Sequence, residues 1–388
     1  MNVGNHYTHL NKAYILNGGN EFFSTLEKMI NDAQTLIHIQ TYVFSDDETG
    51  QKIAEALIAA AHRKVEIYII ADGIASQSLH KSFVEKLISN NIHFRFFEPL
   101  LKTKVCYMGR RLHQKIICID NQKAIVGGIN IANRYNDFPK RKAWLDFAVF
   151  IEGEVVIAIN DFCHSIWHTL PYRDIEINID AKKTFEKINS NERCNIRIRR
   201  NDWIRHKNEI SISYLEMLRN AQEEIIILCS YFIPGKAIRR LLAAAAKRGV
   251  KIKVITAGPS DVMIAKRAER WLYDWLLRNN IELFEYQKNI LHGKLAVADQ
   301  QQVTIGSYNI NNISTYTSIE LNVDIDNVYL AKQLHQKLKT IIDKDCYKIT
   351  EQNHRSAKNP LIQFNRWLSY QFISVVLKAI IFFFKREH

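Results

Sequence analysis

The sequence predicts an α/β protein with two similar α-β-α lobes that arose by internal duplication. The pattern H-x-K-x4-D-x6-G-x2-N begins at His113 and again at His292. The segment LISNNI at 87–92 returns as LLRNNI at 276–281. Helical patterns alternate with apolar strand patterns at corresponding places in both halves, which is typical of helices that cover a mostly parallel sheet. We therefore expect two lobes with the active site between them.

The expected elements follow the same order in each half. A helical pattern precedes an apolar strand that ends in tyrosine, an alanine-rich helix follows, and a second apolar strand comes next. These patterns lie at 22–33, 39–42, 53–61 and 65–71 in the first half, and at 212–221, 228–231, 238–246 and 250–256 in the second half. After the first H-x-K pair, an apolar strand is expected at 116–119.

The repeat also sets the expected domain boundaries. We predict a first domain at 1–177, a polar linker at 178–196, a second domain at 197–345 and a C-terminal tail at 346–388. A chain of 388 residues is long enough for two domains. The N-terminus lacks a basic segment followed by an apolar stretch, so we expect no secretory signal.

The charge balance favours an anionic partner. Lys and Arg total 53 against 40 for Asp and Glu, which gives a formal net charge of +13. This balance suits an acidic membrane surface or a nucleic acid, and charge alone does not choose between them. The six cysteines form no C-x-x-C pair, so the sequence favours neither a zinc site nor a disulfide framework.

The two motifs carry side chains that suit displacement at a phosphodiester. Because alternate residues of a strand share a face, His113 and Lys115 should point together, as should His292 and Lys294. One imidazole can attack phosphorus while the other protonates the departing alkoxide. Lysine and asparagine donors can stabilise the charge that develops on the phosphoryl oxygens, so no metal or other cofactor is expected. The asparagines of the two motifs are Asn130 and Asn309.

Four carboxylates accompany the motifs. Asp120 and Asp299 follow the motif strands in turn-like sequence, which predicts structural anchors placed away from the histidines. Asp146 comes after the first motif and Glu320 after the second, and these carboxylates are candidates to orient the imidazoles. The alternative for all four is an ordinary turn or surface acid.

The doubled motif resembles the phospholipase D superfamily, and the resemblance covers nearly the whole chain. It implies a covalent phosphohistidine on His113, with His292 acting first as general acid and then as base. The residues alone allow the opposite assignment of the two roles. The superfamily signature also counts Asp120 and Asp299 among the active-site residues.

A finer resemblance is to bacterial cardiolipin synthases that lack N-terminal membrane spans. It is carried by the segments 40–50, 292–294, 306–309 and 320–322. The resemblance implies transfer of a phosphatidyl group from phosphatidylglycerol, or from phosphatidylethanolamine, to the hydroxyl of phosphatidylglycerol. A hydrolytic phospholipase D would use the same residues, and a metal-independent nuclease is a less favoured alternative.

The tail favours a lipid substrate. Residues 365–384 are mainly apolar and aromatic, with polar side chains confined to a narrow stripe at helical spacing. We predict an amphipathic helix in the membrane interface, on the cytoplasmic face of the bacterial cell membrane, in a peripheral protein that does not bind nucleic acid. The alternative is a helix packed on the second lobe, or an oligomer contact. The expected membrane contacts are Trp367, Tyr370, Phe372, Lys378 and Phe383.

Overall fold

The computed structural model describes residues 6–99, 110–172, 183–356 and 359–386. The elements of the first half are β1 (Thr8–Asn17), α1 (Asn20–Asp32), β2 (Leu36–Thr41), α2 (Glu48–His62), β3 (Glu66–Asp72), α3 (Lys81–Ser89), β4 (His93–Phe97), β5 (Arg111–Leu112), β6 (Lys115–Ile119), β7 (Lys123–Gly127), η1 (Asn133–Tyr135), β8 (Phe147–Gly153) and α4 (Val155–Trp167). The elements that follow are η2 (Ser190–Glu192), β9 (Cys194–Asp202), β10 (Lys207–Asn208), α6 (Glu209–Asn220), β11 (Glu224–Cys229), α7 (Lys236–Lys247), β12 (Lys251–Ala257), α8 (Met263–Trp271), α9 (Tyr273–Arg278), β13 (Glu282–Tyr286), β14 (Lys294–Ala298), β15 (Gln302–Gly306), α10 (Asn312–Thr317), β16 (Ser318–Asp326), α11 (Val328–Asp345), β17 (Cys346–Ile349), α12 (Glu351–Ser356) and α13 (Pro360–Arg386).

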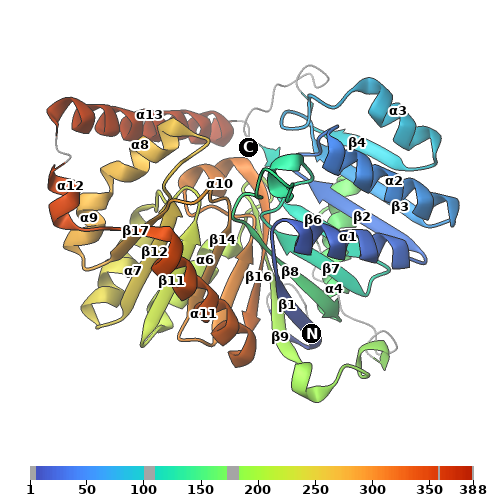
Figure 1. Cartoon of the computed structure of the whole chain (residues 1–388), viewed down its shortest axis with the longest axis horizontal. Helices are drawn as coiled ribbons and strands as arrows, with labels where there is room; N and C mark the ends of the chain where they lie inside the picture. The colour runs from blue at the N-terminus through green and yellow to red at the C-terminus, as the bar shows by residue number, and fades with distance from the viewer. Residues whose placement is uncertain (1–5, 100–109, 173–182, 357–358, 387–388) are drawn as a thin grey trace.

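One continuous sheet runs through both lobes. In the first lobe the strand pairings give the order β4-β3-β2-β6-β7-β8-β1. The second lobe repeats it as β13-β12-β11-β14-β15-β16-β9. β1 and β9 pair antiparallel where the two lobes meet. The two-lobed α/β fold predicted from the repeat is therefore confirmed, and Figure 1 shows the lobes side by side.

The expectation of a mostly parallel sheet is wrong. In the continuous sheet, the described parallel pairs are those within β2-β3-β4 and β11-β12-β13. The motif strands instead form antiparallel hairpins, β6 with β7 and β14 with β15. Asp120 and Asp299 begin these turns with positive φ angles of 54° and 50°. A tight turn of this kind reverses the chain without the helical crossover that a parallel neighbour needs.

Helices cover both faces of the sheet, and three large apolar cores lie among the residues that the structure describes. One core belongs to the first lobe, beneath α1 and α2, and another belongs to the second lobe, beneath α6 and α7. The third core contains residues of both lobes, including Ile116 and Val126 of the first and Leu295 and Leu321 of the second. Because separating the lobes would expose this shared apolar surface to water, the hydrophobic effect holds them together.

Two strands overlap the expected linker and the expected tail. β9 begins at Cys194, so the last residues of the expected linker 178–196 lie in a strand. Residues 178–182 of that linker lie outside the described residues. β17, at the start of the expected tail, pairs with β13 and extends the sheet of the second lobe.

The helix predicted in the tail is present as α13, which lies along α8 (Figure 1). Its inner face packs Tyr370 and Ile373 against Ala268 and Leu272. For this face of the helix, the structure therefore agrees with the alternative of a helix packed on the second lobe. Tyr370 is therefore partly covered by protein, which differs from its expected place among the membrane contacts.

The outer face of α13 is exposed and apolar. Trp367 is 38% exposed and Phe372 is 55% exposed. The side chains of Lys378 and Phe383 lie outside the described residues. Within the part of the chain that the structure describes, no helix has the length and apolar character needed to cross a membrane.

Candidate active site

The histidine and lysine of each motif stand at the start of equivalent strands. His113 follows β5, and Lys115 is the first residue of β6. His292 precedes β14, whose first residue is Lys294. Every residue of β6 and β14 is buried, so the packing of each strand fixes the direction of its H-x-K segment.

Short backbone ladders between the lobes set the geometry of the site. β5 pairs in parallel with the start of β16, and the amide of His113 donates to the carbonyl of Ile319 at 3.0 Å. At the equivalent place Leu145 pairs with Leu291, and the amide of His292 donates to the carbonyl of Leu145 at 2.8 Å. Each histidine is thereby tied to the residue that precedes a carboxylate of the other lobe.

Each histidine contacts a carboxylate of the other lobe. Glu320 of the second lobe lies 2.9 Å from Nδ1 of His113. Asp146 of the first lobe lies 2.7 Å from Nδ1 of His292. Order along the chain places Asp146 after His113 and Glu320 after His292, but the structure pairs each carboxylate with the histidine of the other motif. Because Nδ1 faces a carboxylate, Nε2 is the ring nitrogen that remains for a substrate.

Asp120 and Asp299 lie at the far ends of the motif strands, away from the histidines. Asp120 accepts hydrogen bonds from the backbone amides of Gln34, Thr35 and Leu36 at 2.8 to 2.9 Å. Asp299 accepts from the equivalent segment at 222–224. Burial acts to raise the pKa of Asp120, but these hydrogen bonds outweigh it and lower the pKa. The structure therefore places both as anchors of the strand ends.

Asn130 and Asn309 are buried, with protein contacts of their own. The side-chain oxygen of Asn130 accepts from the amide of Val43 at 2.9 Å, and its nitrogen donates to the hydroxyl of Tyr135 at 2.8 Å. The oxygen of Asn309 lies 3.8 Å from the thiol of Cys229. The contacts of Asn130 fix the loop after β2, and a role in binding phosphate stays a prediction for both asparagines.

The motif lysines, Lys115 and Lys294, are buried, and burial disfavours their charged forms. Burial lowers the pKa of Lys115 to about 7, and it also lowers the pKa of Lys294. The Nζ of Lys294 lies 2.9 Å from Nδ1 of His292. Burial acts to raise the pKa of Asp146, but the charges of Lys294 and His292 outweigh it and lower that pKa. Burial therefore disfavours the charged form of both lysines, and an anionic substrate would favour it.

The pKa values of both imidazoles are lowered, which favours their neutral forms. Burial lowers the pKa of His113, and the carboxylate of Glu320 opposes this shift only in part. Burial and the ammonium of Lys294 lower the pKa of His292 to about 4. Lys294 also contributes to the shift at His113, and Lys115 contributes to the shift at His292. The two motifs therefore act on each other's charge, as expected of one shared site.

Aromatic rings flank the histidines. Tyr42 packs against His113 with ring centres 4.7 Å apart. Tyr135 and Trp144 lie 5.2 and 6.0 Å from the ring of His292. Tyr42 belongs to a segment that the duplication repeats, so the repeat was a signal that could have identified it. The other two rings have no such signal in the sequence.

The residue that follows the first motif glycine differs between the half-sites. A Cβ atom on Gly128 would lie 2.3 Å from an oxygen of Asp146, so the carboxylate of Asp146 occupies the space that a side chain at this position would need. At the equivalent position, the hydroxyl of Ser307 donates to the longer carboxylate of Glu320. The shorter acidic side chain, Asp146, is therefore next to glycine, and the longer one, Glu320, is next to serine.

Asp72, at the end of β3, supports the first half-site. Its carboxylate is fully buried and accepts a hydrogen bond from the amide of Leu112, next to His113, at 2.9 Å. It also lies 3.5 Å from the guanidinium of Arg111. The duplication gives no counterpart to this aspartate, so the repeat does not predict it.

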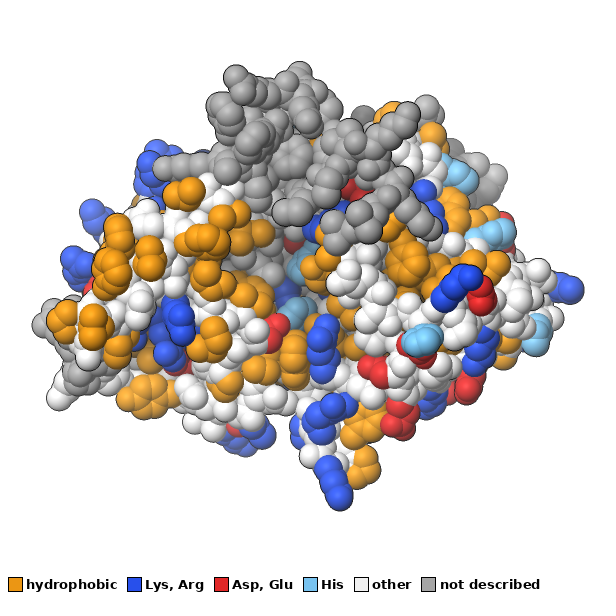
Figure 2. Space-filling model, turned by 90° about the horizontal axis from the view of Figure 1, so that it is seen from above, with side chains coloured by type: hydrophobic (Ala, Val, Ile, Leu, Met, Phe, Trp, Pro, Cys, Tyr) orange, Lys and Arg blue, Asp and Glu red, His pale blue; other side chains and the backbone are white. Residues whose placement is uncertain are grey.

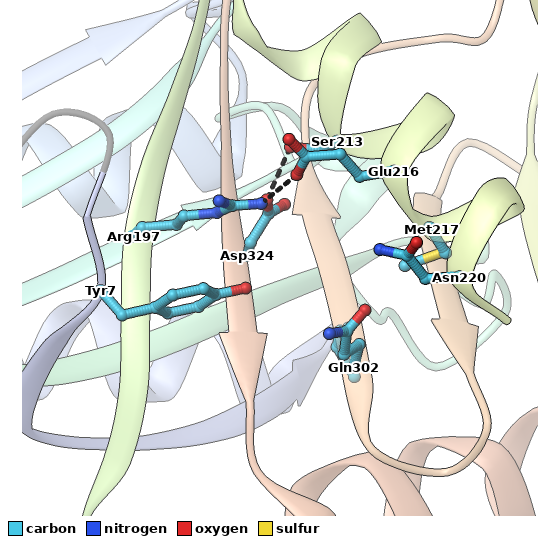
Figure 3. A pocket seen from close by; sticks show the side chains of 9 residues that line it. Tyr7, Arg197, Ser213, Glu216, Met217, Asn220, Gln302 and Asp324 are labelled. Atoms are coloured by element: carbon cyan, nitrogen blue, oxygen red, sulfur yellow. Dashed lines mark hydrogen bonds and ion pairs between the residues drawn. The ribbon is translucent and has the colours of Figure 1, made fainter.

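Figure 2 shows the junction of the lobes as a hollow in which histidine and basic side chains are visible. A separate cavity of about 170 Å³ lies beside α6 and includes Tyr7, Arg197 and Asp324 (Figure 3). Its arginine lies 3.0 Å from Asp324 and 2.7 Å from Glu216. Asp324 and Glu320 stand near opposite ends of β16, so this cavity is distinct from the histidine site.

The sequence also matches known proteins. A family model described as "Cardiolipin synthase, PLD-like domain", where PLD denotes phospholipase D, matches residues 26–158 and 214–342. Cardiolipin synthase B of Shigella flexneri is 32% identical over 352 residues, covering 88% of this chain and 83% of the relative. Cardiolipin synthase B of Escherichia coli K12 is 31% identical over the same shares of the two chains.

Solved structures share the fold. Phosphatidylserine synthase of Haemophilus influenzae Rd KW20 superimposes with a TM-score of 0.71 at 13% identity, covering 98% of this chain and 97% of that chain. Polyphosphate kinase of Porphyromonas gingivalis gives a TM-score of 0.61 at 14% identity, covering 95% and 53%. At these identities the likeness extends to the fold alone. With the match of both motif regions, the chain belongs to the cardiolipin synthase family of phospholipase D-like proteins.

Proposed function

We propose that this protein synthesises cardiolipin by transferring a phosphatidyl group from one phosphatidylglycerol to the hydroxyl of another. The observation that carries the proposal is the pair of histidines at the lobe junction, each facing a carboxylate of the other lobe. Two buried lysines accompany them. This set can attack, protonate and neutralise charge at a single phosphodiester.

In the first step, Nε2 of His113 attacks phosphorus and forms a P–N bond. The bond from phosphorus to the glycerol headgroup breaks, and protonated His292 gives its proton to that oxygen. The lysine ammonium groups stabilise the charge on the phosphoryl oxygens. Since the pKa of His292 is about 4 in the free protein, its acid role requires the anionic phosphate to raise that pKa on binding.

In the second step, neutral His292 removes the proton from the primary hydroxyl of a second phosphatidylglycerol. That oxygen attacks phosphorus, the P–N bond to His113 breaks, and cardiolipin leaves. The carboxylate of Glu320 holds His113 by Nδ1 throughout, so the same nitrogen, Nε2, forms and loses the phosphoryl group. Ping-pong kinetics and retained configuration at phosphorus follow from two displacements.

The outer face of α13 contacts the cytoplasmic surface of the membrane in this proposal. Its support is a row of exposed apolar side chains on the helix face that does not pack on α8, together with the net charge of +13. These side chains are Leu361, Ile362, Phe364, Trp367, Leu368, Phe372, Val375 and Val376. The helix lies along the surface while α8 holds its inner face.

A phosphodiester with a p-nitrophenol leaving group tests the histidine roles, because this group departs without a proton. His292→Asn should release a burst of p-nitrophenol equal to the enzyme and leave a phosphoryl group on the peptide that contains His113. His113→Asn should give no burst. A burst from His113→Asn with the label on His292 would reverse the assignment.

Product analysis tests the reaction itself. Wild-type protein with labelled phosphatidylglycerol in vesicles should form cardiolipin and glycerol, and phosphatidylethanolamine can be compared as donor. Phosphatidic acid without cardiolipin would show a hydrolase and contradict the proposal.

A further inference from the structure

An arginine near the first motif has no charged counterpart near the second motif. Arg134, in η1, stands four residues after Asn130 of the first motif. The equivalent residue, four after Asn309, is Ile313 in α10, which is 41% exposed. The two sides of a nearly symmetrical site therefore differ in charge.

The guanidinium of Arg134 contacts two aromatic rings that in turn contact the imidazole of His292. Its central carbon is 5.5 Å from the ring centre of Tyr135 and 5.2 Å from that of Trp144. Both rings pack against the imidazole of His292. The carbonyl of Arg134 also accepts from the amide of Trp144 at 3.0 Å, which fixes the backbone of this turn. The cation is thus positioned by ring contacts close to the proposed general acid and base.

The side chain of Arg134 is open to solvent. Arg134 is exposed, and among the described residues no carboxylate pairs with it. The cation–π contacts hold its orientation without using its N–H groups, which lie in the guanidinium plane. An arginine held in this way presents a planar fork of donors, the geometry that binds a phosphate in bidentate fashion.

A transfer to a second phospholipid requires a second phosphate site. The acceptor phosphatidylglycerol carries its own phosphodiester, separated from the attacking hydroxyl by the three carbons of glycerol. When that hydroxyl approaches phosphorus near His292, the acceptor phosphate must lie a short distance to one side. Water and free glycerol carry no such charge, so a phosphate site beside the reacting centre favours a phospholipid acceptor over both.

We propose that Arg134 binds the phosphodiester of the acceptor phospholipid and thereby selects a lipid over a small alcohol in the second step. This inference rests on the proposed synthase function. Ile313 marks the opposite side, where α10 contacts α13 and offers apolar surface in place of charge. The difference between these two residues allows donor and acceptor to occupy distinct sides of the duplicated site.

Competition for one intermediate tests the proposal. Wild-type protein receives vesicles of phosphatidylglycerol together with labelled free glycerol, which re-forms labelled phosphatidylglycerol by reversal of the first step. The measured quantity is the ratio of cardiolipin to labelled phosphatidylglycerol. Because both products come from the same phosphohistidine, this ratio isolates the choice of acceptor from the rate of the first step.

Arg134→Met retains the aliphatic packing between the two rings and removes the charge. It should lower the ratio at least about tenfold, as expected for the loss of a charge-assisted hydrogen-bond pair. Arg134→Lys should lower it less. Lys140→Gln removes one charge from an exposed position in the same loop and should leave the ratio unchanged.

Two results would overturn the proposal in different ways. A wild-type ratio in Arg134→Met, with a lower ratio only in Arg134→Ala, would show that the side chain acts through packing. An equal fall in Lys140→Gln would assign the effect to the net charge of the loop. If the wild-type protein exchanges glycerol but forms no cardiolipin, the proposed synthase function itself fails.

Discussion

The two half-sites share the same order of strands and differ in the side chains that support each histidine. His113 contacts Glu320, whose carboxylate also accepts from Ser307, whereas His292 contacts Asp146, which is packed against Gly128. The strands, turns and anchoring aspartates are repeated closely in both lobes. The duplication therefore reproduces positions, and small substitutions around each histidine give the two imidazoles different surroundings.

This difference matters because the proposed reaction needs two imidazoles in opposite protonation states. Burial and the two lysines lower the pKa of both imidazoles, and that of His292 is lowered to about 4. The half-sites also differ in their neighbouring rings, since Tyr42 packs on His113 whereas Tyr135 and Trp144 pack on His292. A symmetrical scaffold can support an asymmetric mechanism when its second layer of residues has diverged.

The largest expected effect comes from neutralising either carboxylate. Glu320→Gln and Asp146→Asn should each lower kcat/KM on phosphatidylglycerol by roughly a hundredfold or more, because each imidazolium loses its stabilising charge. With the p-nitrophenyl substrate, Asp146→Asn should retain its burst while Glu320→Gln slows it. Equal bursts from both variants would contradict the division of roles between the half-sites.

Exchanging the glycine and the serine at positions 128 and 307 should lower kcat/KM by different amounts. In Gly128→Ser the new Cβ would meet an oxygen of Asp146 at 2.3 Å, so the carboxylate must move and its contact with His292 is lost. We expect a loss of kcat/KM of roughly tenfold to a hundredfold. Ser307→Gly removes one hydrogen bond to Glu320 and should cost less than about tenfold. Similar losses in both would show that the half-sites tolerate the same residues.

The next largest expected effect is on membrane binding by the exposed face of α13. Phe372→Glu removes an apolar side chain from the outer face and should weaken binding to anionic vesicles about tenfold. Asn365→Glu adds the same charge at an exposed polar position of the helix and serves as the control. Vesicle sedimentation measures both. Equal weakening in the two variants would show that charge, and not apolar contact, controls binding.

The smallest expected effect is a change in the pH profile. Lys115 acts in its charged form, and its pKa is lowered to about 7, so its charge is lost as pH rises through that value. The kcat/KM should therefore fall above about pH 7. Lys115→Arg stays charged and should remove this alkaline decline. On the acid side, the lowered histidine pKa values keep the nucleophile neutral below the usual histidine range. A flat wild-type profile to pH 9 would contradict the role of Lys115.

Much of the fold followed from the repeat, because two copies of one pattern must form similar elements. The sequence also predicted a strand at 116–119 after the first H-x-K pair, and β6 occupies Lys115–Ile119. The parallel arrangement was wrongly extended to the motif strands, since the hairpin turns at Asp120 and Asp299 depend on local left-handed backbone conformations. A pattern of apolar residues does not specify the direction of a neighbouring strand.

The exchange of carboxylates could not be read from spacing. It depends on the ladders that join Leu145 to Leu291 and β5 to β16, which form only when the lobes meet. Asp72 and Trp144 were missed because neither belongs to the repeated pattern. The tail showed its amphipathic character in sequence, but the packing of Tyr370 on α8 depends on tertiary contacts.

The ladders between the lobes make each half dependent on the other. A lobe produced alone would keep its histidine and lysine but would carry the carboxylate that belongs to its absent partner. If the chain were cut in the segment between α4 and β9, neither fragment would turn over substrate. Activity would return when the fragments reassociate, so the rate of recovery would report lobe docking directly.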